Sequence, residues 1–263
     1  MYSFEYQKPA SLADAVKAGG GDARFLAGGQ SLVQSMKLRL ASASTLVDLG
    51  GLAELRGIQV SPTEVTIGAA IRHAEVAASA DVRQTLPALA DLASVIGDPM
   101  VRNMGTLGGS LANADPAADY PAAVLALNAT IRTDRRTIAA DDFFKGLYET
   151  ALQPGEIIVS VTFPVPEKAG YEKLRQPASR FALVGVFVAK TAAGVRVGVT
   201  GAKASAFRAT PIEQALAANF TADAAAAVKM PDTDINTDLH GSAQYRAAMI
   251  SVIASRAVAK ANA

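Results

Sequence analysis

Hydrophobic positions along the chain follow two spacings, and the mixture predicts an α+β protein. Short apolar runs of strand type lie at residues 24–27, 45–49, 64–68, 129–133 and 156–163. Apolar positions spaced three or four residues apart, typical of helices that pack on a sheet, lie at 32–38, 74–79, 81–95 and 122–127. Residues 97–121 are rich in Gly, Pro, Asn and Asp, and we interpret them as a long ordered loop that carries function.

The pattern changes after Pro164-Val165-Pro166, where we place a domain boundary. Two apolar segments, 181–188 and 195–199, flank a turn at 191–194 and predict a β-hairpin. Helical patterns follow at 211–218, at 222–228 and from about Ser242, the last with Tyr245, Met249, Val252 and Ile253 on one face. We therefore expect a first domain of residues 1–166, in two parts split near 55–60, and a smaller α+β domain of residues 167–263 with an antiparallel sheet backed by helices.

Composition narrows the function classes. The 25 Lys and Arg balance 24 Asp and Glu, so the chain has no electrostatic footprint for nucleic acid. The longest apolar run, Phe181–Ala189, is too short to span a bilayer, and the first nine residues lack the features of a secretory signal, so we expect a cytoplasmic protein without stable membrane insertion. There is no cysteine, which excludes disulfides, thiolate nucleophiles and iron–sulfur ligation by this chain.

Histidine offers no alternative chemistry in the sequence. The two histidines, His73 and His240, are far apart and belong to no serine, carboxylate or metal-ligand pattern, and we predict both to be surface or capping residues. The sequence therefore nominates no catalytic residue and no metal ligand.

Two glycine-rich loops are the candidate ligand-binding segments. Ala27-Gly28-Gly29-Gln30-Ser31 and Thr106-Leu107-Gly108-Gly109-Ser110 each adjoin an apolar segment and end in a hydroxyl residue. Glycine lets backbone N–H groups close on a phosphate, so two such loops suggest a dinucleotide gripped at two points, although for each pair alone a plain tight turn is the favoured interpretation. The sequence contains neither G-x-G-x-x-G nor a P-loop, which disfavours a Rossmann fold and excludes a P-loop site.

Two carboxylates follow the second loop, in Asn113-Ala114-Asp115-Pro116-Ala117-Ala118-Asp119. Asp115 precedes a proline and is predicted to cap a helix that begins at Pro116. Asp119 lies one turn later, where its carboxylate could accept hydrogen bonds from ribose or ribityl hydroxyls.

These segments together resemble the FAD-binding medium subunits of molybdenum hydroxylases, the family of xanthine dehydrogenase and aerobic carbon monoxide dehydrogenase. The most specific match is the block from Asp98 to Ser110, with its Arg102-Asn103-Met104-Gly105-Thr106 lead. The resemblance covers effectively the whole chain in order. The other matching segments are 27–32, 116–119, 142–148, 156–158 and 171–174.

The resemblance implies a two-part FAD-binding domain of the vanillyl-alcohol-oxidase (PCMH) type, followed by a smaller domain that closes over the flavin ring. It implies non-covalent FAD, with Asp119 hydrogen-bonded to a cofactor hydroxyl and a cation near the ring at Arg175, or at Lys173 if the register slips. The residues that the resemblance assigns to the cofactor are Phe25, Leu26, Ala27, Gly28, Gly29, Gln30, Ser31, Leu32, Val101, Thr106, Gly108, Gly109, Ser110, Asp119, Ile158, Lys173 and Arg175.

The implied function is electron transfer. The molybdenum cofactor and two [2Fe-2S] clusters would belong to a large and a small partner subunit, in a dimer of heterotrimers, and electrons would pass through this FAD to an external acceptor. A free-standing FAD-dependent oxidase of the same fold and a scaffold that has lost its flavin are the alternatives. The intact glycine loops argue against the scaffold.

Overall fold

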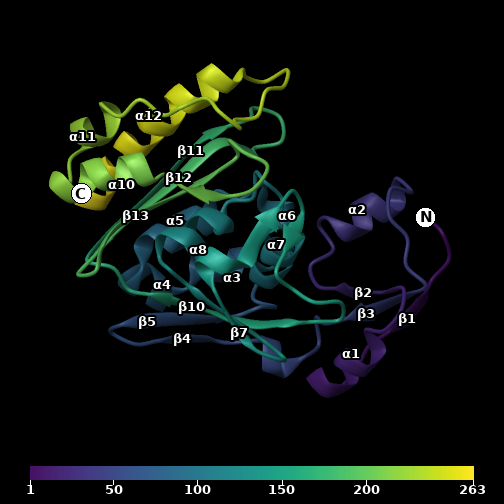
Figure 1. The fold of residues 1–263 in the computed structure, drawn as a ribbon. Coiled ribbons are helices and arrows are strands. Elements are labelled where there is room, and N and C mark those ends of the chain that lie inside the picture. The colour runs from purple at the N-terminus through teal and green to yellow at the C-terminus, as the bar shows by residue number, and fades with distance from the viewer.

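The computed structural model describes all 263 residues and arranges most of them in four layers (Figure 1). A five-stranded sheet, a layer of helices, a four-stranded sheet and a second layer of helices follow one another. A small N-terminal lobe lies to one side of them. The fold is α+β, as the sequence predicts.

The N-terminal lobe is a parallel three-stranded sheet in the order β1-β3-β2, with strands at Glu5–Gln7, Thr45–Asp48 and Ala23–Leu26. Helix α1 (Leu12–Ala18) is capped by the Ser11 hydroxyl, which accepts a hydrogen bond from the Asp14 amide at 3.2 Å. Helix α2 (Leu32–Lys37) begins directly after the first glycine loop. A short 3₁₀ turn at Ala53–Leu55 leads out of the lobe.

The five-stranded sheet is antiparallel, in the order β4-β5-β10-β6-β7. Its strands are Ile58–Val60, Glu64–Gly68, Ile158–Pro164, Thr130–Thr133 and Thr137–Ala139. The helices beside it are α3 (His73–Ala78), α4 (Ala80–Thr85), α5 (Pro87–Ser94), α6 (Pro99–Arg102), α7 (Leu107–Asn113), α8 (Tyr120–Ala126) and α9 (Ala140–Phe143), and a small hairpin of β8 (Phe144–Gly146) and β9 (Glu149–Thr150) follows.

The C-terminal sheet is antiparallel, with strands β11 (Lys168–Arg175), β12 (Ala182–Thr191), β13 (Gly194–Thr200) and β14 (Phe207–Arg208). Helix α12 (Ala243–Asn262) contacts β11 and β12 on the outer face, beside α10 (Thr210–Ala218) and α11 (Ala222–Ala226), while α5 and α8 contact the inner face. Tyr171, Phe187 and Ala189 consequently belong to the same hydrophobic core as the helices of the middle layer.

The predicted long loop at 97–121 is wrong, because the segment contains α6 and α7. The glycines of the second loop lie inside α7, whose first amides donate to carbonyls at the end of β5 and just beyond it, at Ala69 and Ile71. The predicted helix at 81–95 is likewise two helices, since Pro87 begins a new one. In α7, the hydrogen bonds to Ala69 and Ile71 outweigh the low helix propensity of Gly108 and Gly109.

Two local predictions also need correction. No helix begins at Pro116: the Asp115 carboxylate accepts from the Ala117 amide at 2.9 Å within a turn, and the next helix begins at Tyr120. In α12 the buried face follows Arg246 rather than Tyr245, which is 46% exposed. The Arg246 guanidinium donates to the carbonyls of Leu183 and Gly201, so a buried arginine occupies a position that a hydrophobic pattern assigns to solvent.

Candidate functional site

A cavity of about 770 Å³ lies where the N-terminal lobe meets the five-stranded sheet and its helices. Both glycine loops line it, and so do Thr150, the segment Leu152–Ile158 that leads into β10, and the tip between β11 and β12. Its volume falls within the range of cofactor pockets, about 300–1,000 Å³. The cavity therefore gathers residues from the N-terminal sheet, from the five-stranded sheet and its helices, and from the connection between β11 and β12.

The first glycine loop presents unpaired backbone donors. None of the amides of residues 27–32 donates a hydrogen bond to an acceptor of the chain, and the Ser31 hydroxyl makes no capping bond to α2. In a loop that is only partly buried, such amides are open to water or to a ligand, and consecutive amides form an anion-binding nest when they converge. Gly29 has φ +70°, a conformation that glycine adopts without strain.

Gly28 has a different role from the one its position in the loop suggests. A Cβ at Gly28 would lie 2.1 Å from the Met104 carbonyl oxygen and 2.7 Å from the Gly105 Cα. The missing side chain lets the first loop contact the backbone that precedes the second loop. Gly28 thus joins the N-terminal lobe to the middle of the molecule.

The second glycine loop is not a nest of free amides. The amides of Leu107 and Gly108 donate to the carbonyls of Ile71 and Ala69, and the Gly109 amide donates to the Thr106 hydroxyl at 3.1 Å. A Cβ on Gly108 would lie 2.5 Å from the Ala69 Cβ, so this glycine serves close helix–strand packing. The groups it leaves for a ligand are side chains, the Ser110 hydroxyl and the Asn113 amide, which line the cavity without protein hydrogen bonds.

Asp119 lines the cavity and belongs to a buried ion pair. Its Oδ1 lies 2.7 Å from Lys173 Nζ and accepts a hydrogen bond from the Tyr171 hydroxyl at 2.5 Å, both from β11. Burial raises the pKa of the Asp119 carboxyl, while Lys173 and Tyr171 oppose that rise. The Thr200 hydroxyl donates to the carbonyls of Pro116 and Ala118, so the C-terminal sheet holds the whole turn before α8.

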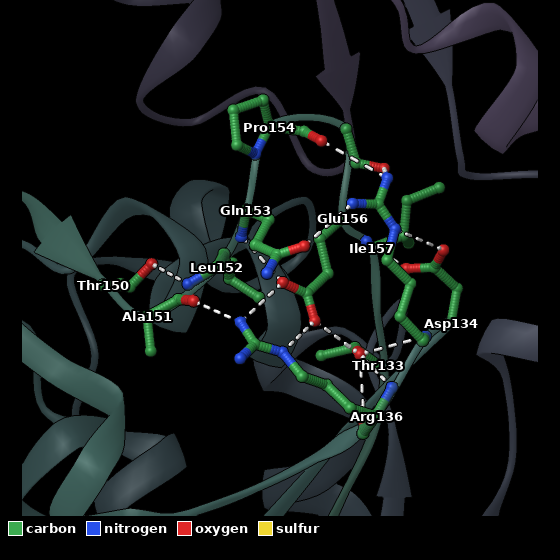
Figure 2. Close-up of polar contacts among 12 residues, drawn as sticks. Thr133, Asp134, Arg136, Thr150, Ala151, Leu152, Gln153, Pro154, Glu156 and Ile157 are labelled. Carbon is green, nitrogen blue, oxygen red and sulfur yellow. Dashed lines mark hydrogen bonds and ion pairs between the residues drawn. The ribbon is translucent and has the colours of Figure 1, made fainter.

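A second buried carboxylate, Glu156, also lines the cavity, and Figure 2 shows its polar contacts. The Glu156 side chain is fully buried, and its oxygens accept from Arg136 Nε at 2.9 Å, the Thr133 hydroxyl at 2.7 Å and the Gln153 amide at 2.7 Å. These bonds, led by the one from Arg136, lower the pKa of Glu156 to about 2. The network fixes the segment Leu152–Ile158, every residue of which lines the cavity.

Most of the predicted cofactor residues line this cavity, and three do not. Leu26 packs beside the small core cluster around Met36, Lys173 lies behind Asp119, and Arg175 is exposed at the end of β11. The predicted residues that the cavity brings together are Phe25, Ala27, Gly28, Gly29, Gln30, Ser31, Leu32, Val101, Thr106, Gly108, Gly109, Ser110, Asp119 and Ile158.

Sequence reasoning missed several cavity residues. The prediction that His73 lies at the surface is wrong, because it is 4% exposed and lines the cavity beside Gly105. Segments 152–157 and 179–181 also contribute, the latter through Ser179 and Phe181 at the tip between β11 and β12. No spacing in the sequence signals these residues, because they lie on segments far apart in the chain that only the fold brings together.

The fold and the cavity together define an α+β protein with a site large enough for a cofactor, and comparison with known proteins gives its family. Residues 2–166 match the FAD binding domain in molybdopterin dehydrogenase. The chain belongs to the family of FAD-binding medium subunits of molybdenum hydroxylases.

The relatives match over nearly their whole length. The chain is 35% identical to the carbon monoxide dehydrogenase medium chain of Afipia carboxidovorans, over 99% of this chain and 97% of that one. It is 34% identical to the nicotine 6-hydroxylase medium subunit of Paenarthrobacter nicotinovorans, over 99% and 98%. Among solved structures, reconstituted CO dehydrogenase from Oligotropha carboxidovorans superimposes with a TM-score of 0.90 at 33% identity, covering 99% of this chain and 98% of that one.

The cavity fits the cofactor of this family. FAD carries an anionic diphosphate between two polar arms, and the site offers a run of free backbone amides, uncommitted hydroxyl and amide side chains and a buried carboxylate. FAD is the cofactor of this chain, and the molybdenum cofactor and iron–sulfur clusters belong to other subunits. The chain is thus an oxidoreductase subunit. None of its helices combines the length and the apolar character that a bilayer crossing requires.

Proposed function

We propose that this chain is the electron-transfer subunit of a heteromeric molybdenum hydroxylase, accepting electrons from iron–sulfur clusters of a partner and passing them to an external acceptor. The observation that carries the proposal is the free-amide nest at residues 27–32 in a chain without cysteine. The chain is built to hold a flavin but has no thiolate to ligate a cluster. When bound, FAD supplies the redox chemistry; the protein holds it, sets its electrostatic surroundings and shields it from water.

The residue assignments form part of this proposal. The nest at residues 27–32 holds the diphosphate, and the segment Thr106–Ser110 contributes the Ser110 hydroxyl to the adjoining sugar. Asp119 accepts from a cofactor hydroxyl through Oδ2, since Oδ1 is taken by Lys173 and Tyr171. Lys173, which acts through Asp119, and Arg175 are the two candidates for the cation near the flavin ring.

The domain division and the assembly are also proposals. Residues 1–166 form the FAD-binding domain, with the split near 55–60, and residues 167–263 form the C-terminal domain. The chain works with a large molybdenum subunit and a small iron–sulfur subunit, as a dimer of heterotrimers in the cytoplasm. Relatives of similar identity carry names that refer to carbon monoxide, nicotine and glyceraldehyde, which supports a substrate site on the partner rather than on this chain.

The purified chain tests the cofactor claim. We expect a yellow protein whose released nucleotide is FAD, or a colourless protein that becomes yellow when FAD is added. A protein that stays colourless with FAD contradicts the proposed function. Copurification from the native cell, followed by reduction of quinone, oxygen, cytochrome and NAD in turn by the loaded complex, tests the partners and identifies the acceptor.

The alternative is a free-standing FAD-dependent oxidase of the same fold. It requires a substrate site beside the flavin in this chain alone. If the isolated, flavin-loaded chain oxidises a substrate without partners, the alternative replaces the electron-transfer proposal. If the flavin is reduced only when the iron–sulfur subunit is present, the alternative is wrong.

A further inference from the structure

His73 is a buried histidine that the fold alone does not explain. It is the first residue of α3, is 4% exposed and lines the cavity. Its amide donates to the Gly105 carbonyl at 3.0 Å, which ties α3 to the approach to the second glycine loop. The imidazole therefore occupies a fixed place in the cavity wall, between the two loops that the cofactor must contact.

The imidazole has no hydrogen-bond partner in the protein. Nδ1 is buried without a partner, and neither ring nitrogen takes part in any side-chain hydrogen bond. The ring packs against Tyr120 with centroids 5.4 Å apart, and the Tyr120 hydroxyl is also buried without a partner. Nδ1 is sealed inside the protein, whereas Nε2 also lacks a protein partner and is not sealed, so Nε2 is the ring nitrogen that a ligand can reach.

The backbone beside His73 is shaped around its other nitrogen. A Cβ on Gly105 would lie 2.6 Å from Nε2, so only glycine leaves room for the ring in its present orientation. Gly28, which opens the free-amide nest, packs against the same Gly105. Nε2 of His73 and the backbone of Gly28 therefore both lie beside Gly105, in the wall of the same cavity.

The electrostatic surroundings keep the ring neutral. Burial, aided by the positive charge of Arg102 on α6, lowers the pKa of His73 to about 4. Asp119, the neighbour of the Tyr120 that packs against the ring, is already paired with Lys173. A neutral imidazole carries one N–H, so it serves as a hydrogen-bond donor without adding a charge.

We propose that His73 is a cofactor-binding residue, whose Nε2–H donates a hydrogen bond to a diphosphate oxygen of FAD alongside the amides of residues 27–32. The inference deepens the proposed function and rests on the diphosphate position assigned there. In this arrangement the amides supply several donors from the N-terminal lobe, and His73 supplies one from the middle of the molecule. The diphosphate then bridges the two parts of the FAD-binding domain.

The test compares FAD with riboflavin, which has no diphosphate, on the full-length chain. His73→Leu removes the donor at similar volume, and His73→Gln places an amide nitrogen near the position of Nε2. We expect His73→Leu to weaken FAD binding by about 10- to 100-fold, the usual value of a hydrogen bond to a charged group, and to leave riboflavin binding unchanged. His73→Gln should recover most of the FAD affinity.

A structural role predicts a different result. Because His73 buries an unpartnered nitrogen, the apo form of His73→Leu should unfold at the same denaturant midpoint as the wild type or at a higher one. Equal weakening of FAD and riboflavin, or FAD binding unchanged in His73→Leu, would overturn the proposal while leaving the proposed function intact. Failure of the wild type itself to bind FAD would instead overturn the proposed function.

The chain offers matched controls. His240 is exposed in the C-terminal domain, so His240→Phe should bind FAD as the wild type does, and it leaves His73 as the one histidine signal for ¹⁵N NMR. In that variant the Nε2 resonance should shift when FAD is added and should stay in place when riboflavin is added. Tyr120→Phe keeps the ring contact and should change FAD affinity less than about twofold; a shift with riboflavin alone contradicts the diphosphate assignment.

Discussion

The Glu156 network of Figure 2 gives the sharpest stability prediction. Glu156→Gln keeps the shape of the side chain but removes its charge, in a fully buried position that accepts from Arg136, Thr133 and the Gln153 amide. The neutral amide loses the ion pair. It also turns an NH₂ group toward one of these donors, so at least one buried donor loses its acceptor.

The magnitude follows from the pKa of Glu156, which falls from 4.5 to about 2. A shift of about 2.5 units corresponds to roughly 3 kcal/mol, and the 41% exposure of the Arg136 side chain reduces that to about 2–3 kcal/mol through solvent screening. Because the folded-state pKa is the lower one, this stability is fully present above pH 4.5. It is lost as the pH falls through about 2, with roughly half remaining at pH 3.

Urea unfolding of the apo-protein, followed by circular dichroism at pH 7 and at pH 3, measures this difference. Glu156→Gln should be about 2–3 kcal/mol less stable than the wild type at pH 7, and the gap should fall by about half at pH 3. Glu149→Gln, an exposed carboxylate before the same segment, is the control and should change stability by less than about 0.5 kcal/mol. A gap below 0.5 kcal/mol at pH 7, or one that does not narrow with acid, refutes the reasoning.

Three further predictions concern the cavity walls. Gly28→Ala should destabilise the apo-protein by about 1–3 kcal/mol in urea unfolding, because its Cβ would lie 2.1 Å from a backbone oxygen. Gly109→Val should instead be purified without FAD and should lose less stability than Gly28→Ala. Lys173→Met should cost about 3–5 kcal/mol by leaving Asp119 buried without its counter-charge, and adding Asp119→Asn should restore part of that loss; equal stability of the single and double variants contradicts this. Between pH 7 and pH 4.5, the free energy of unfolding of the wild type should fall by about 2–3 kcal/mol relative to that of His73→Leu. The reason is that the pKa of His73 is 6.5 in the unfolded chain and about 4 in the folded protein, so the unfolded chain binds the proton first. Parallel pH profiles of the two proteins would contradict this.

Local signals in the sequence predicted much of the architecture. The strand at 64–68 and the hairpin around residues 191–194 are confirmed, because each depends on residues close together in the chain. Strand β11 was missed, since its alternation is weak and its place is set by pairing with β12. Helix α7 within 97–121 is not predicted because its first amides bond to the carbonyls of Ala69 and Ile71, which are distant in sequence.

The site was predictable to the extent that it uses consecutive backbone. The two glycine loops together predict a phosphate-binding segment at 27–31, whereas the contact of Gly28 with Met104 can be seen only when the two segments fold together. A histidine such as His73 carries no sequence signal for burial, because its position depends on a space left by Gly105. A site formed by residues that are distant in the sequence and meet only in the folded structure cannot be predicted from residue spacing.

The shared core has a consequence for how this protein can be recombined. Tyr171, Phe187 and Ala189 of the C-terminal sheet pack within the core of the middle layer, and Thr200 holds the turn that presents Asp119. A chain cut after residue 166 would expose that core and leave Asp119 without either partner. The flavin module that sequence comparison delimits is therefore not a portable unit. A chimera that takes this module from a relative would have to take the C-terminal sheet from the same relative, or change the residues on both sides of the shared core together.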